Sequence, residues 1–284
     1  MSKVLAVLIA AGVLTLISLQ LLPSLQQLGY LLLGVTGAIF ANSTGAGGGV
    51  VFIPLFAQLG FTEQQALSTS FGIQCFGMTA GAITWSVYLW LQNTRGTALP
   101  VAWRNFLILV ALCVPLSIAG LWTNYALALP VPAGLNQLFG VFSLILGICI
   151  LLTVFTLKPG LAHRNLLGGD LVVVALITYA GGILTAWLSV GVGEIVAFYL
   201  IFRRYDAVIA VAAAVVITAF TVWSAAPIHL SADSAINWQV LAFAGPGAVM
   251  GGIIARSLVG WLSPRGLKIF FGSWLLFIGL AEFL

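Results

Sequence analysis

Long apolar segments alternate with short polar breaks along almost the whole chain. Most are about 20 residues long, which is typical of helices that cross a membrane. Two are longer, and glycine and polar residues interrupt them near 42–49 and 189–193. To within a few residues, the predicted segments lie at 4–22, 28–60, 64–91, 102–123, 132–157, 167–202, 207–229, 238–261 and 265–283.

The second half of the chain repeats the pattern of the first. A shift of 144 residues aligns the segments at 28–91 with the later ones without a gap, and a shift of 132 aligns the two segments that follow. The order of breaks, glycines and spans indicates a duplication, which is common in transporters. Matched positions include Gly37 with Gly181, Gly47 with Gly191, Gly49 with Gly193 and Gly120 with Gly252.

The placement of basic residues indicates how the interrupted segments lie. If the segment at 28–60 crossed the membrane once, Arg95 and Arg104 would face outward, against the positive-inside rule. If it is a hairpin that enters and leaves on one side, every basic loop faces the cytoplasm. Three net crossings per repeat then invert one repeat relative to the other. The alternative is a pair of ordinary helices in which glycine allows close packing.

We therefore predict an all-α polytopic membrane protein built from two inverted repeats. Each repeat is a glycine-broken helical hairpin followed by three spanning helices. The N-terminus is expected in the cytoplasm and the C-terminus in the periplasm, and residues 1–22 are interpreted as an uncleaved helix. The expected units are an extra N-terminal transmembrane helix (1–27), a first transmembrane repeat (28–160) and a second, inverted repeat (161–284).

Composition supports the membrane class. The chain is 62% hydrophobic and only 6% charged, whereas about a quarter of the residues of a soluble globular domain are charged. The net charge of +4 does not indicate nucleic-acid binding, because the basic residues lie at the ends of apolar segments. Cys75, Cys113 and Cys149 lie within apolar segments and form no CxxC pair. They are interpreted as small buried side chains, with Cys75 the one to test for substrate chemistry.

The interruptions are the candidate binding site. Bare backbone is tolerated at membrane depth only where protein buries it or it lines a wet cavity. Glycine N–H groups at the start of a half-helix form an anion site without a charged side chain. Two such half-helix starts facing each other could frame one small anion. The candidate substrate-binding residues are Asn42, Ser43, Thr44, Gly45, Gly47, Gly48, Gly49, Ser68, Thr69, Ser70, Gln74, Trp187, Ser189, Gly191 and Gly193.

Several of these residues have a second interpretation. Ser68, Thr69, Ser70 and Gln74 could face the site, or they could bond back to helix carbonyls. Glu194 is the only carboxylate that the pattern places deep in the membrane. It is a candidate for proton coupling, and equally a structural cap for the N–H groups of the turn.

The stretches "GAIFANSTGAGGGVVFIPLFAQLGFTEQQALSTS" and "GPGAVMGGIIARSLVGWLSPRGLKIFFGSWLLFIGL" resemble the TauE/SafE (sulfite exporter) family of membrane transporters. The resemblance covers residues 28–284 and implies a bacterial inner-membrane protein that transports sulfite or related organosulfonates. It carries over to Gly45, Gly47, Gly48, Gly49 and Pro54. The second turn departs from the family pattern, because Glu194 follows Gly193 and Phe198 stands where a second proline is expected.

The resulting hypothesis is a secondary transporter that works by alternating access, as an exporter. The alternatives are an anion channel and a proton-coupled uptake permease for a sulfur compound. An enzyme is not expected, because neither His163 nor His229 lies mid-span and no nucleophile motif or metal-ligand spacing occurs. No cofactor or metal is expected. The expected partners are the anionic substrate and the lipid bilayer, with no nucleic acid, and the sequence leaves a homodimer open.

Overall fold

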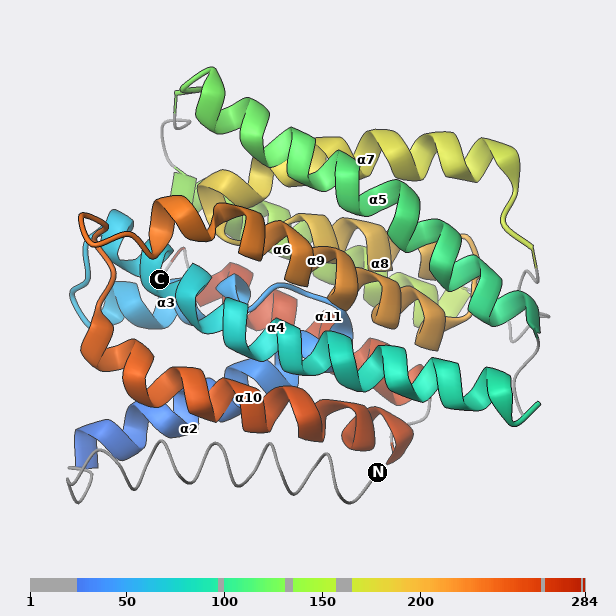
Figure 1. Cartoon of the computed structure of the whole chain (residues 1–284), viewed down its shortest axis with the longest axis horizontal. Helices are drawn as coiled ribbons and strands as arrows, with labels where there is room; N and C mark the ends of the chain where they lie inside the picture. The colour runs from blue at the N-terminus through green and yellow to red at the C-terminus, as the bar shows by residue number, and fades with distance from the viewer. Residues whose placement is uncertain are drawn as a thin grey trace.

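Every secondary-structure element that the structure describes is an α-helix, as predicted (Figure 1). The structure is a computed structural model, and it describes residues 25–96, 100–130, 135–156, 165–261, 264–281 and 283. The predicted N-terminal helix at 4–22 lies outside these residues. The helices are α2 (Leu25–Thr44), α3 (Gly49–Gln58), α4 (Glu63–Thr94), α5 (Pro100–Ala126), α6 (Leu135–Thr156), α7 (Gly168–Leu188), α8 (Val192–Phe202), α9 (Ala207–His229), α10 (Trp238–Trp261) and α11 (Pro264–Ala281).

The two long apolar segments are broken where the sequence predicted. The first divides into α2 and α3 around residues 45–48, and the second divides into α7 and α8 around residues 189–191. Helices α3 and α8 have 10 and 11 residues. At 1.5 Å per residue each is about 15 Å long, roughly half the thickness of the hydrocarbon core. They are half-helices, too short to cross a membrane alone.

Four helices within the described ranges are long and apolar enough to cross a membrane. This statement rests on their length and composition alone. The four spans are Val101–Ala126, Gly168–Leu188, Ala207–His229 and Trp238–Trp261.

The helices form two groups that run in opposite directions. Helices α4 and α9 are antiparallel, because Ser68 bonds to His229 while Cys75, further along α4, bonds to Val222, earlier in α9. Helix α10 runs parallel to α4, and α5 runs parallel to α9. The contacts that fix these directions are Thr69–Asn237 and Gly77–Ala248 for α4 and α10, and Ser117–Thr221 and Tyr125–His229 for α5 and α9.

The contacts between helices follow the same correspondence as the sequence shift. Helix α2 packs on α10, and α7, which stands 144 residues after α2, packs on α5. In the same way α4 packs on α10 and α9 packs on α5. Each half of the chain therefore packs its hairpin against a spanning helix of the other half, and the two halves interlock around the α4–α9 contact.

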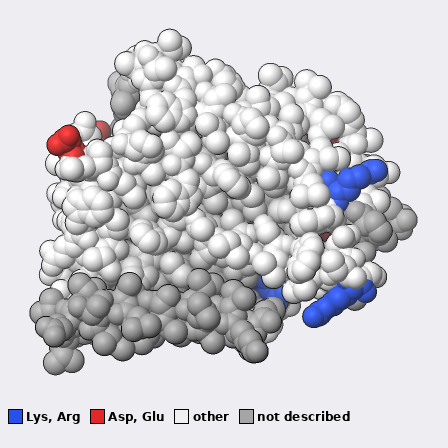
Figure 2. All heavy atoms as spheres, in the orientation of Figure 1, with Lys and Arg blue, Asp and Glu red and all other residues white. Residues whose placement is uncertain are grey.

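Basic side chains, Lys and Arg together, gather at one end of the helix bundle (Figure 2, right). Arg95 follows α4, and Arg203 and Arg204 precede α9, which is antiparallel to α4, so these three share an end. Glu63 at the start of α4 and Asp233 after α9 lie at the opposite end. Basic residues that are far apart in the sequence thus lie at the same end of the folded molecule.

Asp170 closes the second hairpin at the arginine end. Its buried carboxylate accepts hydrogen bonds from Tyr199, Tyr205 and Arg203, and the Arg203 Nε atom is 2.8 Å away. These contacts hold the start of α7 against the end of α8, so this hairpin begins and ends on one side. The hydrogen bond to Asp170 raises the pKa of the Arg203 guanidinium.

Small residues let α10 approach α2 closely. A Cβ atom on Gly251 would collide with the Val35 carbonyl oxygen and lie 2.9 Å from the Ala38 Cβ. Gly260, on the same helix, has no atom within 4 Å of such a Cβ. Glycine is therefore required by packing at the first position and is free to change at the second.

We expect Gly251→Ala to lower the stability of the protein by about 1–3 kcal/mol, because the methyl group overpacks the α2–α10 contact. Gly260→Ala is the matched control and should leave stability unchanged or raise it by up to about 1 kcal/mol, through helix propensity. The measurement is the unfolding temperature of the purified protein in detergent. Equal unfolding temperatures for the two variants would contradict the close packing.

Candidate functional site

The first glycine turn joins α2 to α3. Gly45 takes a positive φ of 82°, a conformation that favours glycine, and its N–H ends α2 by bonding to Ala41. The Thr44 hydroxyl bonds back to the Phe40 carbonyl and accepts from the Ala46 N–H at 3.2 Å. The chain then enters α3 with its first N–H groups directed at the turn.

The second glycine turn joins α7 to α8 in a similar way. Ser189 adopts a left-handed conformation with φ 56°, and Gly191 has φ 139°. The Thr185 hydroxyl, on the last turn of α7, accepts from the Val192 N–H at 3.2 Å. The sequence predicted both turns, and the start of α8 here is the second half-helix start, after that of α3.

The two turns touch each other through their backbones. A Cβ atom on Gly49 would lie 2.5 Å from the Ser189 carbonyl oxygen, and one on Gly193 would collide with the Gly45 carbonyl oxygen. Gly49 and Gly193 are equivalent under the 144-residue shift. Glycine at both positions is therefore explained by the close approach of the two turns.

Glu194 bridges the two turns with its carboxylate. Its Oε1 atom accepts from the Gly47 N–H at 2.7 Å, and its Oε2 atom accepts from the Gly191 N–H at 2.7 Å. The side chain has no exposed surface. Glu194 thus caps the turn N–H groups, which was one of the two hypotheses for it.

Gln74 makes a second bridge from the middle of α4. Its Oε1 atom accepts from the Gly48 N–H at 2.8 Å. Its Nε2 atom donates to the Ser189 hydroxyl at 2.6 Å and to the Ser189 carbonyl at 3.0 Å. Ser70, one turn earlier, bonds to the Ser189 hydroxyl at 2.9 Å. These side chains face the turns, so bonding back to helix carbonyls does not describe them.

Other predicted residues from the first repeat point away from this contact. The Asn42 amide donates to Ala38 and Gly77, and the Ser43 hydroxyl donates to Ala255 on α10. Ser68 bonds to His229, and Thr69 accepts from the Asn237 N–H. These four residues tie helices together. Trp187 packs in an apolar cluster, and its indole N–H has no partner among the described residues.

Thr218 is a residue of the site that the sequence analysis missed. It is 2% exposed, and its hydroxyl has no partner among the residues that the structure describes. A Cβ on Gly193 would lie 2.5 Å from the Thr218 hydroxyl oxygen, so Thr218 lies against the second turn. The signal was present, because the 144-residue shift places Thr218 on Gln74.

Asp170 is a second addition to the sequence analysis. The sequence pattern places only the Glu194 carboxylate deep in the membrane, but the Asp170 side chain is also buried, at 5% exposure. It follows two glycines near the start of an apolar segment, where the sequence could not reveal that two tyrosines and an arginine would cover it. Its place at the end of the hairpin separates it from the glycine turns.

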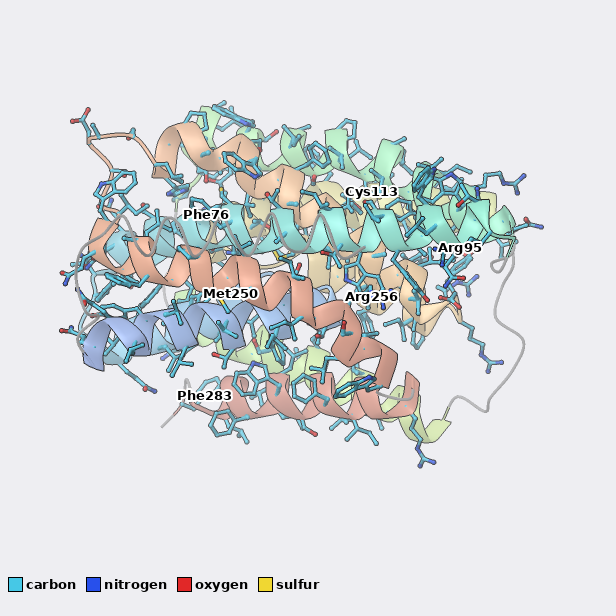
Figure 3. All side chains as sticks on the ribbon, turned by 60° about the horizontal axis from the view of Figure 1, so that its bottom comes forward. Phe76, Arg95, Cys113, Met250, Arg256 and Phe283 are labelled. Atoms are coloured by element: carbon cyan, nitrogen blue, oxygen red, sulfur yellow. The ribbon has the colours of Figure 1, made fainter. Side chains whose placement is uncertain are left out.

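Arg256 and the cysteines also have defined surroundings. The Arg256 guanidinium lies 4.3 Å from the centre of the Tyr88 ring, and Figure 3 shows Arg256 on the side of α10 nearer to Arg95. Its described partner is thus an aromatic face. Cys75 and Cys113 are buried, Cys149 is half-buried, and all three thiols are free, in keeping with small apolar side chains.

A small gap lies beside the first turn, between α2, α3, α4 and α10. It is bounded by Asn42, Gly48, Phe52 and Gln74 and is too small for a water molecule. No group of three or more metal-ligating side chains occurs among the described residues. The chemistry that the arrangement supports is hydrogen bonding of an oxyanion by backbone N–H groups, and in this structure a carboxylate of the protein fills that role.

These features define a polytopic α-helical membrane protein whose two half-helix turns meet around an oxyanion group. The chain belongs to the sulfite exporter TauE/SafE family, whose model matches residues 30–281. The family assignment made from the two sequence stretches is therefore confirmed. The family consists of transporters, which is consistent with the expectation that the protein is not an enzyme. No curated protein matches the chain. No solved structure matches it either.

We expect Gln74→Leu to destabilise the protein by ~3 kcal/mol, because it leaves the buried Gly48 N–H and the Ser189 carbonyl without the partner that Gln74 supplies. The matched control is Gln64→Leu, an exposed position of the same helix, which should change stability by less than about 0.5 kcal/mol. Unfolding in detergent, followed by tryptophan fluorescence, measures both. A Gln74→Leu variant as stable as its control would show that the bridge contributes nothing.

Proposed function

We propose that the protein is a secondary transporter of a small sulfur-containing oxyanion, such as sulfite or an organosulfonate, and that it binds this anion between the two glycine turns. The observation that carries the proposal is the pair of 2.7 Å hydrogen bonds by which one N–H from each turn holds the Glu194 carboxylate. A sulfonate or sulfite group presents similar oxygen acceptors. The family supports the sulfur class of substrate.

The substrate-binding surface in this proposal is mainly backbone. Gly47, Gly48 and Gly191 supply N–H donors, and Gly45, Gly49 and Gly193 allow the two turns to approach. Ser70, Gln74 and Ser189 add polar side chains at the same place. Backbone donors at half-helix starts suit an anion that must also be released, because they carry only partial charges.

We infer that residues 28–160 and 161–284 are inverted repeats that rock against each other to give alternating access. The opposite directions of α4 and α9 and the matching helix contacts support this inference. The first hairpin begins and ends near Glu63, and the second begins and ends near Arg203, so the two open toward opposite ends of the bundle. Residues 1–27 would add one further helix.

The proposed orientation places the arginine end in the cytoplasm of a bacterial cell, with the protein in the inner membrane. The positive-inside rule supports this choice, since Arg95, Arg203 and Arg204 share that end. The N-terminus is then cytoplasmic and the C-terminus periplasmic. Export of an anion is favoured by an inside-negative potential, by about 2.3 kcal/mol per charge at 100 mV. Uptake would require cotransported protons, for which Glu194 is the candidate.

The proposal predicts that at least one sulfur oxyanion stabilises the purified protein. Saturating ligand at 100 times its Kd should add about 2.7 kcal/mol and raise the unfolding temperature by several degrees. The measurement is a thermal-shift series with sulfite, sulfoacetate, taurine, thiosulfate and sulfate against chloride at equal ionic strength. Gly49→Ala should reduce the shift, because its methyl group would press on Ser189. A flat response to every oxyanion would contradict the proposal.

Transport kinetics separate the carrier from an anion channel. A carrier in proteoliposomes should show saturable uptake and counterflow, in which unlabelled anion inside the vesicle accelerates entry of labelled anion. The direct backbone contact between the two turns supports the carrier, since Gly49 and Gly193 lie against Ser189 and Gly45 of the opposite turn. Large single-channel currents in a planar bilayer would favour the channel instead.

A further inference from the structure

The Glu194 carboxylate occupies the position where the glycine turns would hold an anion. Its two oxygens take one N–H from each turn, Gly47 and Gly191, each at 2.7 Å. The third donor, the Gly48 N–H, is held by the Gln74 amide oxygen at 2.8 Å. A substrate anion and the Glu194 carboxylate therefore compete for the same two N–H groups.

The surroundings of Glu194 offer no charge that could hold two anions together. The polar residues that contact the two turns include Gln74 from α4, Thr185 and Ser189 from the end of α7, and Thr218 from α9, all of them neutral. The carboxylate accepts hydrogen bonds from the backbone N–H groups of Gly47 and Gly191, and no charged side chain among the described residues bonds to it.

The titratable groups of the neighbouring helices lie elsewhere and are already engaged. Asp170 and Tyr199 bond to each other at the far end of the α7–α8 hairpin, and His229 bonds to Ser68 and Tyr125 at the end of α9. Two like charges in a buried, low-dielectric site repel strongly. A substrate anion can thus enter only after the carboxylate has left the turns or lost its charge.

We propose that Glu194 is a tethered substitute for the substrate, which leaves the glycine turns by taking up one proton each time an anion binds. The proton comes from solvent and is added to the Glu194 carboxylate, and the neutral carboxyl group swings away from the Gly47 and Gly191 N–H groups. The anion then accepts from both. No bond other than the new O–H bond forms, and the bound state holds one anion and one proton. This inference rests on the proposed function.

The substitute also explains why the empty site is stable. Without an acceptor, the N–H groups of two half-helix starts would be buried and unpaired. The carboxylate keeps them paired until an anion replaces it. For a monovalent substrate, the exchange adds no net charge to the site, because one proton enters with the anion.

The test is the number of protons that the purified protein takes up when it binds thiosulfate or sulfoacetate. Neither probe titrates between pH 6 and pH 8, so any proton is taken up by the protein. Calorimetry in buffers of different ionisation enthalpy gives the number directly. We expect about one proton per anion for the wild type, and an affinity that falls about tenfold per pH unit above neutrality.

Glu194→Gln is the matched variant, because it keeps the shape of the side chain and an acceptor oxygen but cannot exchange a proton. It should bind the same probe with no proton uptake and with equal affinity at pH 6 and pH 8. Wild-type binding with no proton uptake would overturn the inference, and this result needs no variant. Proton uptake by Glu194→Gln equal to that of the wild type would also overturn it. If neither protein binds any oxyanion, the proposed function itself fails.

Discussion

The hydrogen bonds from the Gly47 and Gly191 N–H groups to the Glu194 carboxylate connect the two halves of the chain where each helix is broken. Backbone in a membrane cannot leave its N–H groups unpaired, so a chain that breaks two helices there must supply acceptors. One carboxylate supplies an acceptor to each turn. The close contact of the turns, the need for glycine and the position of Gln74 all agree with the need to keep these buried groups paired.

The site is asymmetric although the two halves correspond. Under the 144-residue shift, Glu194 stands on Val50 and Gln74 stands on Thr218. The first half supplies the glycine-rich turn and the long polar side chain of α4, and the second half supplies the carboxylate. The Thr218 hydroxyl, which has no partner among the described residues, marks the place where the second half has no equivalent of Gln74. A single oxyanion position between two unlike turns suits one substrate group held from both sides.

The ends of the two hairpins differ in the same way. Asp170 ties the start of α7 to Arg203, whereas the corresponding positions of the first hairpin are Gln26 and Leu59. The second hairpin is therefore held together by an ion pair at the arginine end of the bundle. The first has apolar and neutral side chains at its own end. In the proposed alternating-access cycle, this difference would make one hairpin easier to open than the other.

The sequence predicted much of the helical framework. Apolar segments predicted the helices, and glycine clusters predicted both breaks. The shift of 144 residues matched the starts of α2, α3 and α4 to those of α7, α8 and α9 within one residue, although α4 continues further than α9. It also placed Ser70, Gln74, Ser189 and Glu194 among the site residues. It could not separate these from Asn42, Ser43, Ser68 and Thr69, because polar residues three or four apart look alike until their partners are known.

The features that the sequence alone could determine are those that depend on signals within a single segment. Hydrophobicity, glycine content and the positions of arginine act within one segment, and so they fix helices, breaks and the polarity of the molecule. The tertiary structure decided which side chains meet. Glu194 reaches Gly47 across 147 positions of the chain, and Gln74 reaches Ser189 across 115. Such contacts depend on how α4, α8 and the two turns pack together, and packing is a property of the whole fold rather than of any segment.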